Sequence, residues 1–216
     1  MLLFIRNCLT PKDDIITVTP ETEASELVRI LSERGLESIP VVDEKGYFLG
    51  ITGYGHLLKS ALEQSEGDWR HMKVKDALHT INPLTLSHDF EETLPVIVRH
   101  PFVPVVSDDG FTFLGIVKIS DIEAALADTY GHALPGIRFL LAVVMDVPHE
   151  LEQILDAVRA FDVNIISVVT FDAGDAAARR ILLKVSPTPH GDPIRQCLEE
   201  KGFRVLSMKE KAAVTK

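Results

Sequence analysis

An acidic side chain follows an apolar run in residues 113–126, FLGIVKISDIEAAL, where a strand is expected to lead into a helix. Ser120 and Asp121 stand at the expected start of that helix. Both residue types are favoured helix caps, and an acid suits the positive end of the helix dipole. The same carboxylate could also accept charge-assisted hydrogen bonds from ligand hydroxyl groups. The residues alone leave both roles open for Asp121.

A near-copy of this stretch, FLGITGYGHLLKS, occupies residues 48–60 and has His56 in the place of Asp121. A neutral imidazole offers one hydrogen-bond acceptor and an imidazolium offers none. His56 is therefore a poorer partner for two hydroxyls than Asp121. The alternative for His56 is a solvated residue at a helix start.

Motifs of enzyme chemistry are missing from the sequence. It contains no Gly-x-Ser-x-Gly elbow, no P-loop, no His-Glu-x-x-His pair and no Cys-x-x-Cys pair. The eight histidines follow no recognisable metal spacing. We predict a protein that is not an enzyme and that has no catalytic residues, no metal site and no required cofactor.

The composition predicts a globular protein of one or two domains, with 46% hydrophobic and 25% charged residues. The longest apolar run that could be taken for a membrane segment, residues 139–145, is much shorter than the roughly 20 residues of a membrane-spanning helix. Residues 137–216 carry equal numbers of acidic and basic residues, so the formal net charge of −10 belongs to residues 1–136. That acidity argues against nucleic acid as a partner. Two distant cysteines and no evident secretory signal favour a cytoplasmic location, with no membrane contact.

An internal repeat covers the first part of the chain. Residues 15–62 and 82–126 align in order, with Pro40 matching Pro104 and Gly50 matching Gly115. Each copy predicts a helix, shorter in the second copy, then a buried strand (IPVV or VPVV), a turn (DEKG or SDDG), a returning strand and a second helix. The polar residues 65–73 are predicted to be a linker.

A different pattern follows residue 136. The sequence predicts a strand over 137–147, a helix with Pro148 at its start, two strands around a turn at 173–177, a helix ending at Gly202 and a last strand. Residues Leu151, Ile154, Leu155, Val158 and Phe161 share one helical face. The order of these elements predicts a ferredoxin-like βαββαβ unit.

These patterns together resemble a known family. The two units with hydrophobic-Pro-Val-Val and Gly-apolar-apolar before a helix look like a tandem pair of CBS domains, and VPHELEQI with VNII resembles an ACT domain. The combination is similar to the CBS–CBS–ACT proteins of the acetoin-utilisation accessory family. The implied fold is α+β, with CBS repeats at 1–66 and 74–131 and an ACT-like domain at 137–210.

The resemblance implies a regulatory protein that binds an adenosine-containing ligand such as AMP, ADP or ATP between the repeats. Its Asp position, here Asp121, would hold the ribose. Carried over to this chain, the nucleotide cleft consists of Thr17, Leu36, Ser38, Ile39, Pro40, Lys118, Ser120 and Asp121. A degenerate second cleft consists of Thr52, Gly53, His56, Thr85, Val103 and Pro104. Lys118 replaces a hydroxyl residue of the family and, like Arg99, could meet a phosphate or point to solvent.

The resemblance also bears on the last unit. Amino-acid-binding relatives often carry a Gly after the Pro of the first strand-to-helix turn, which here reads Asp146-Val147-Pro148-His149. His149 adds bulk at that point. Asn164 could cap a turn or contact a ligand. The other expectation for this domain is homodimer formation. The alternatives for the whole chain are a ligand-free interaction scaffold and an enzyme with an unrecognised site between domains.

Overall fold

The computed structural model describes residues 4–63, 69–144, 148–175 and 178–212. The chain divides into two compact units, Met1–Ala125 and Leu126–Lys216. The predicted domain limits within them stay a prediction.

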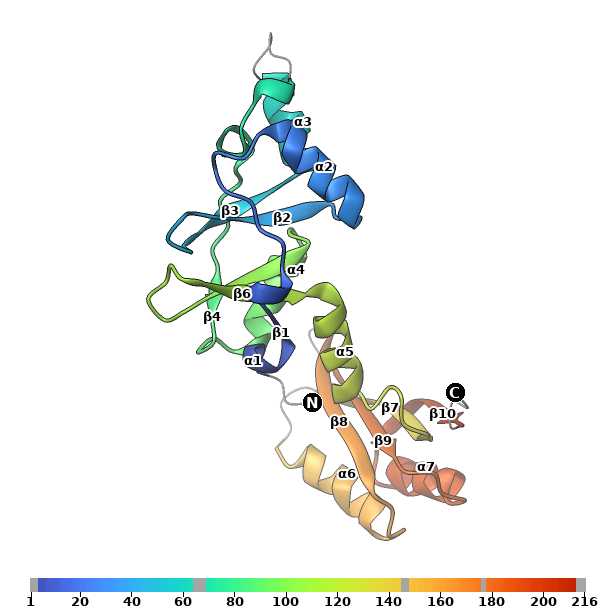
Figure 1. Cartoon of the computed structure of the whole chain (residues 1–216). Helices are drawn as coiled ribbons and strands as arrows, with labels where there is room; N and C mark the ends of the chain where they lie inside the picture. The colour runs from blue at the N-terminus through green and yellow to red at the C-terminus, as the bar shows by residue number, and fades with distance from the viewer. Residues whose placement is uncertain (1–3, 64–68, 145–147, 176–177, 213–216) are drawn as a thin grey trace. The chain divides into compact units, whose positions relative to one another are not determined.

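The first repeat combines two helices and a hairpin (Figure 1). Helix α2 (Ala24–Arg34) buries Ala24, Leu27 and Leu31 along one face and ends at Gly35, whose φ of 62° closes a left-handed C-cap. Strands β2 (Ser38–Val42) and β3 (Phe48–Gly53) pair antiparallel, and α3 (Tyr54–Glu63) follows. The predicted helix, strands and turn are confirmed.

The second repeat copies this plan with a shorter first helix. Strand β4 (Leu84–Thr85) precedes the 3₁₀ helix η4 (Phe90–Glu92) and the five-residue helix α4 (Thr93–Ile97). The hairpin of β5 (Phe102–Val106) and β6 (Phe113–Lys118) leads into α5 (Ile119–Thr129). The shorter helix predicted for this copy is confirmed.

The segment before each repeat pairs with the hairpin of the other repeat. Helix α1 (Ile5–Cys8) and strand β1 (Leu9–Pro11) precede the first repeat, yet β1 pairs antiparallel with β6 of the second. In the same way His79, which precedes the second repeat, exchanges two backbone hydrogen bonds of 2.9 Å with Ile51 of β3. A Cβ at Gly115 would collide with the Thr10 carbonyl oxygen, and one at Gly50 with that of His79. The matching glycines therefore permit these close approaches.

Apolar side chains join the two repeats. Ile51 of the first repeat is buried with Phe102, Phe113 and Ile116 of the second. The two hairpin turns also meet, because Phe48 donates its backbone N–H to the Phe111 carbonyl oxygen and Phe113 donates to that of Gly46, both at 2.9 Å. The repeats consequently share one core region.

The described part of the predicted linker is not a solvated loop. Trp69–His71 form the 3₁₀ helix η2, and Val74–Ala77 form η3. Met72 is buried with Ala24 and Leu57, and Trp69 packs against the same cluster. Residues 69–73 lie between the two repeats, as a linker should, and their apolar side chains among polar neighbours anchor this segment to α2 and α3. Residues 64–68 lie outside the described residues.

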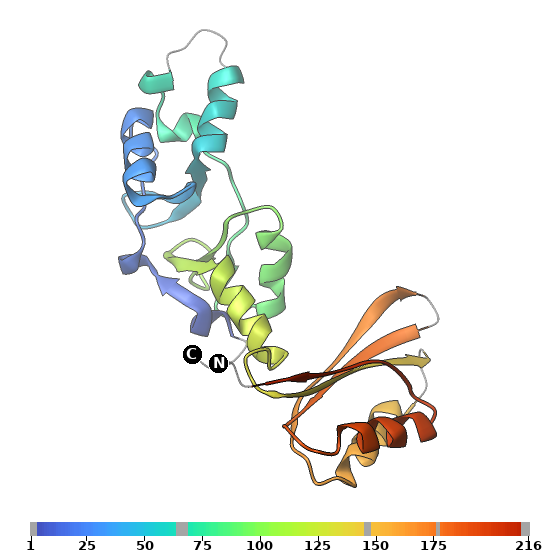
Figure 2. The same ribbon diagram turned by 90° about the vertical axis from the view of Figure 1, so that its right-hand side faces the viewer.

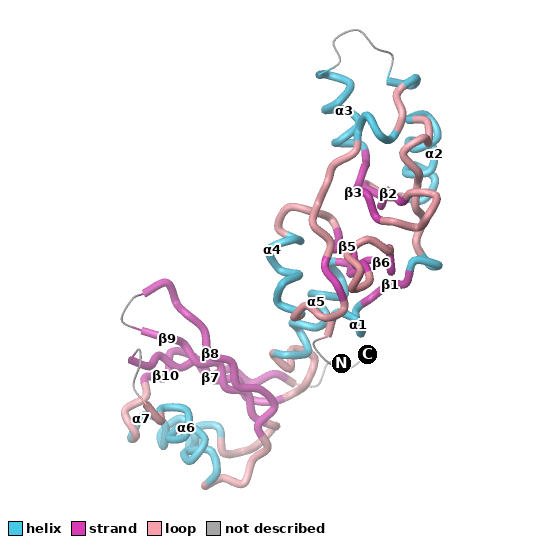
Figure 3. The backbone as a smooth tube through the Cα atoms, turned by 90° about the vertical axis from the view of Figure 1, so that its left-hand side faces the viewer, coloured by secondary structure: helices cyan, strands magenta, loops and turns pink. Residues whose placement is uncertain are grey.

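The second unit is a four-stranded antiparallel sheet with two helices on one face (Figures 2 and 3). Its elements are β7 (Gly136–Val144), α6 (Glu150–Arg159), β8 (Ile165–Asp175), β9 (Ala178–Val185), α7 (Gly191–Glu200) and β10 (Arg204–Lys211). The strand order is β10-β7-β9-β8. This is the ferredoxin-like arrangement that the order of elements predicted.

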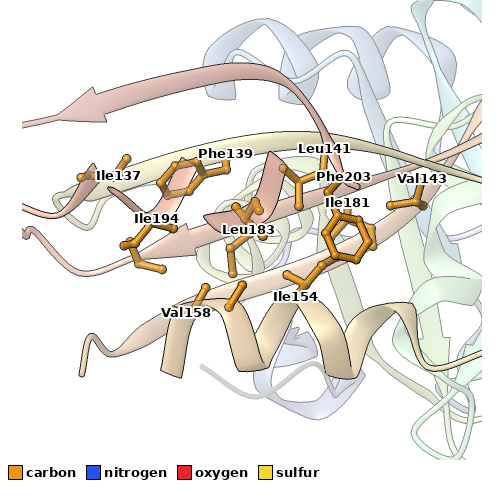
Figure 4. Packing of buried hydrophobic residues seen from close by; sticks show 13 residues of the cluster. Ile137, Phe139, Leu141, Val143, Ile154, Val158, Ile181, Leu183, Ile194 and Phe203 are labelled. Atoms are coloured by element: carbon orange, nitrogen blue, oxygen red, sulfur yellow. The ribbon is translucent and has the colours of Figure 1, made fainter. Parts of the chain in front are cut away.

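Alternate residues of β7 and β9 face the helices and form the core of this unit (Figure 4). Phe139 and Leu141 of β7 and Leu183 of β9 are wholly buried against Ile154 and Val158 of α6. Ala157 joins this buried face of α6, whereas Leu151 is exposed. Leu151 belongs to the first turn of α6, and this end of the predicted apolar face is exposed.

Candidate functional site

A pocket of about 430 Å³ lies in the first unit, between the two repeats. That volume suits a small organic ligand. The first repeat contributes the chain between α2 and β2, and the second contributes parts of β5 and β6. The lining residues are Asp14, Ile15, Ile16, Arg34, Gly35, Leu36, Glu37, Ser38, Ile39, Pro40, Pro101, Phe102, Ile116 and Lys118.

Five residues predicted for the nucleotide cleft line this pocket. Leu36, Ser38, Ile39 and Pro40 follow the left-handed turn at Gly35, which ends α2 and directs the chain into β2. Lys118 ends β6 on the opposite wall and is exposed. Segments about 80 residues apart in the sequence thus meet at one pocket.

Three other predicted residues, Thr17, Ser120 and Asp121, are outside the pocket lining. Thr17 is exposed, while Val18 beside it is buried. Helix α5 begins at Ile119, so Ser120 and Asp121 lie in its first turn and neither is the cap residue. The cap prediction for Asp121 is wrong in position, although a carboxylate in the first turn still interacts favourably with the helix dipole.

The Asp121 carboxylate is half-buried and close to the N-terminal segment. Burial raises the pKa of the Cys8 thiol, and the negative charge of Asp121 raises it further. Among the described residues, none donates a hydrogen bond to this carboxylate. The acceptor capacity of Asp121 is therefore available to a ligand.

The pocket combines an apolar interior with a charged rim. Ile16, Leu36 and Ile116 offer apolar surface suited to one face of a planar ring. Two cations, Arg34 and Lys118, and two acids, Asp14 and Glu37, stand at exposed positions around it. Such a lining can hold an aromatic base inside and a phosphate near the cations.

Sequence reasoning missed part of this lining. Arg34 lies in the last turn of α2, and Phe102 is the first residue of β5. Arg34 could have been noticed from its place directly before Gly35, because the last turn of a helix adjoins the next loop. Ile116 is a strand residue with no polar signal, and only the pairing of the two repeats places it here.

The residues predicted for the second cleft are engaged in contacts within the protein. The buried Thr52 donates its hydroxyl to the Ala77 carbonyl oxygen at 3.1 Å. The Thr85 hydroxyl lies 2.6 Å from Ser87 Oγ and 2.8 Å from His88 Nδ1. Gly53 abuts the Glu37 carbonyl oxygen, and Val103 and Pro104 are buried.

Three histidines from three different segments converge beside the second cleft. The rings of His56 and His79 stack with centroids 4.7 Å apart, and His79 lies 5.5 Å from His100. Burial lowers the pKa of His56, and the positive charges of His79, His100 and Lys59 lower it further. Burial, followed by His79 and Arg99, likewise lowers the pKa of His100. His56 lies in the first turn of α3, as predicted, and is half-buried by this stacking and not fully solvated.

Arg99 lies on the side of this histidine cluster, next to His100, and is exposed. It is outside the lining of the 430 Å³ pocket. A phosphate in that pocket is better placed for Lys118 and Arg34.

The first strand-to-helix turn of the second unit is only partly described. Asp146 and Val147 lie outside the described residues. His149 adopts φ 68° at the residue before α6, and its Nδ1 lies 2.9 Å from Glu152 Oε2. The left-handed conformation is one that glycine adopts most easily. Asn164 accepts a backbone hydrogen bond of 2.9 Å from Ser186 through its carbonyl oxygen.

The part of the chain that the structure describes has neither a metal-binding cluster nor a membrane-spanning helix. No group of three or more His, Cys, Asp or Glu side chains in it could hold a metal ion. No helix in it is both long and apolar enough to cross a bilayer.

Comparison with known proteins gives a consistent picture for the first unit. The family model described as "CBS domain" matches residues 5–63 and 74–128, more than half of the chain. An uncharacterised protein of Methanocaldococcus jannaschii is 28% identical over 61 residues. This match covers 28% of the chain but only 23% of that curated relative.

Solved structures share the fold of the first unit. CbpB in complex with c-di-AMP has a TM-score of 0.51 and 21% identity, over 57% of this chain and 83% of that one. CBSX2 in complex with AMP has a TM-score of 0.50 and 19% identity, over 58% of this chain and 96% of that one. At these identities the likeness establishes the fold alone.

Proposed function

Because the chain belongs to the CBS-domain family, we propose that it is a non-catalytic regulatory protein that binds an adenosine-containing ligand in its 430 Å³ pocket. The observation that carries this proposal is the meeting of Leu36–Pro40 and Lys118 at one pocket between the repeats. Two proteins with the same fold support it, since one is bound to c-di-AMP and the other to AMP.

The lining suggests how such a ligand is held. The adenine ring lies between the apolar side chains of Ile16 and Ile116, where burial removes its faces from water. The ribose extends toward the first turn of α5, where the carboxylate of Asp121 accepts from its hydroxyls. The phosphate lies at the rim, within the fields of Lys118 and Arg34.

We propose one working cleft per chain. In the second cleft the hydroxyls of Thr52 and Thr85 are already engaged, and His56 stacks on His79 in the place where the other repeat has a carboxylate. None of Thr52, Thr85 and His56 offers a nucleotide there a carboxylate that could accept from both ribose hydroxyls, as Asp121 does in the first cleft.

We assign the second unit to the ACT-like domains on the order of its strands and helices, and propose that it mediates formation of a homodimer. The link to the CBS–CBS–ACT proteins and the cytoplasmic location are part of the same proposal. Ligand binding can shift the assembly only by the difference in affinity between its states. Light scattering of the full chain, with and without nucleotide, tests this part.

The binding site is tested by calorimetry of the full chain with AMP, ADP, ATP, S-adenosylmethionine and c-di-AMP. At least one of these compounds is expected to bind with one site per chain. Asp121→Asn and Lys118→Gln should each weaken binding about tenfold or more, because each removes a charge-assisted hydrogen bond worth roughly 1.5–3 kcal/mol.

Matched controls separate the site from the overall charge. The control for Asp121→Asn is Asp128→Asn, since Asp128 is exposed and lies two turns further along α5. The control for Lys118→Gln is Lys59→Gln, which removes an exposed lysine of α3. Both should bind as the unmodified chain does. Lack of binding by every adenosine compound would favour the interaction scaffold, and full binding by Asp121→Asn and Lys118→Gln would place the site elsewhere.

A further inference from the structure

A second pocket, of about 570 Å³, lies on the face of the second unit that α6 and α7 leave open. Arg138 of β7, Lys184 of β9, and Lys209 and Lys211 of β10 line it, together with Tyr130 and Leu182. The core residues Ile137, Phe139, Leu183 and Met208 alternate with these cations along the strands and face the helices. The strand alternation therefore places the cations on the open face.

Three of the cations stand side by side across the sheet. Arg138 is directly opposite Lys184 on one neighbouring strand and opposite Lys209 on the other. Lys211 follows two residues later on the same face of β10. Like charges directly opposite one another destabilise a sheet unless something neutralises them. A bound anion would therefore stabilise the sheet at Arg138, Lys184 and Lys209.

Lys184 shows that this is a built pocket and not a loose group of surface lysines. The residue is only 4% exposed, and its ammonium donates to the carbonyl oxygens of Gly131 and Leu134, both at 2.6 Å. An ammonium has three protons, so one donor remains after these two bonds. Burial lowers the pKa of Lys184, and the charge of Lys211 lowers it further.

The pocket lacks a matching set of acids. Glu210 is the single acid in its lining, and along β10 it alternates with Lys209 and Lys211, so its side chain is directed to the other side of the strand. His132 also lines the pocket, and its carbonyl oxygen accepts a hydrogen bond from the Lys211 ammonium. Within the described residues, neither Arg138 nor Lys209 has a carboxylate partner.

We propose that this pocket binds a small organic polyanion, a phosphate ester or a di- or tricarboxylate with an apolar body. Arg138 and Lys209 pair with the negative groups, and the remaining proton of Lys184 donates to one of them. The ring of Tyr130 and the side chain of Leu182 contact the apolar part. The site belongs to the second unit and does not depend on nucleotide binding by the first.

The proposal is tested by calorimetry of the full chain with inorganic pyrophosphate and with citrate, each at low and at high salt. One or both should bind, and binding should weaken as salt rises. Preference for pyrophosphate identifies a phosphate ester as the ligand class, and preference for citrate identifies a carboxylate. The paired change Arg138→Gln and Lys209→Gln should weaken binding at least tenfold.

The matched control also removes one arginine and one lysine from the same unit, but on its helix side, with the paired change Arg159→Gln and Lys201→Gln. Both residues are exposed. It should bind like the unmodified chain. Equal loss in both paired variants, or no binding of either anion by a chain whose melting curve shows it folded, overturns the proposal. AMP titrated into the same samples reports on the first unit, so failure of one site is distinguished from failure of the other.

Discussion

At the scale of the residue, His149 is held in a conformation that its side chain disfavours. Its φ of 68° lies in the left-handed region, which costs a non-glycine residue roughly 1–2 kcal/mol. Its exposed contact with Glu152 offsets little of that cost. The backbone at this position therefore favours glycine over any residue with a side chain.

We expect His149→Gly to be more stable than His149→Ala by roughly 1 kcal/mol, because both changes remove the contact with Glu152 and only glycine relaxes the backbone. Urea unfolding of the two variants measures the difference. The glycine and alanine variants of His190, where φ is −92°, are the control. There the glycine variant should be no more stable than the alanine variant. Equal stability of the two His149 variants would contradict the argument.

The stacked histidines make stability depend on pH. In the unfolded chain His56 takes up a proton near its ordinary pKa of 6.5, whereas in the folded protein it does so only at lower pH. As the pH falls below 6.5 the unfolded state binds more protons, so the folded state loses stability. His100 acts in the same direction, since its pKa is also lowered.

We therefore expect the melting temperature to fall between pH 7 and pH 5, and to fall less in His56→Asn. Besides the neighbouring histidines, the positive charge of Lys59 acts on His56 and that of Arg99 acts on His100. Thermal unfolding over that pH range measures the slope. His190→Asn, at an exposed position, should leave the slope as it is, and an unchanged slope in His56→Asn would contradict the assignment.

At the scale of the element, helices and strands with a clear local pattern were predictable. The spacing of Leu27 and Leu31 predicted α2, and the alternation of Phe139 and Leu141 with Arg138 follows from the strand character of β7. The packing of residues 69–73 against α2 and α3 was not predictable, because the two apolar side chains that make it, Trp69 and Met72, stand among polar residues. The pattern identifies an element well where many of its residues share one face.

Contacts between distant segments were harder to predict. The family resemblance assigned Leu36, Ser38–Pro40 and Lys118 to one cleft, and these residues line one pocket; their role in binding stays a prediction. The convergence of His56, His79 and His100 had no signal in the sequence, because they come from three segments that only the fold brings together. The open face of the second unit was missed for the same reason, since the pairing of Arg138 with Lys184 and Lys209 depends on strand register.

At the scale of the whole molecule, the first unit is one structure and not two repeats in series. Phe113 of the second repeat is buried beside Ile51 of the first, and its ring lies 5.7 Å from that of Phe48. A side chain at this place contributes to both repeats. Loss of its volume should therefore weaken them together.

We expect Phe113→Ala to lower the free energy of unfolding of the first unit by about 3–5 kcal/mol, as for other buried phenylalanines. Both repeats should lose stability in the same transition, which hydrogen exchange measures residue by residue. Phe111→Ala is the control, because that ring is 63% exposed and its removal should change stability by less than about 0.5 kcal/mol. Selective loss of protection in the second repeat would contradict a shared core.

The pairing of β1 with β6 has a consequence for the order in which the chain can fold. Residues Leu9–Pro11 leave the ribosome long before Phe113–Lys118 have been made. Strand β1 therefore cannot pair until β6 has been synthesised. A nascent chain that has just completed the first repeat holds a strand with no place in that repeat. The first unit therefore becomes complete only when β6 has been synthesised, and its N-terminal residues are among the last to find their places.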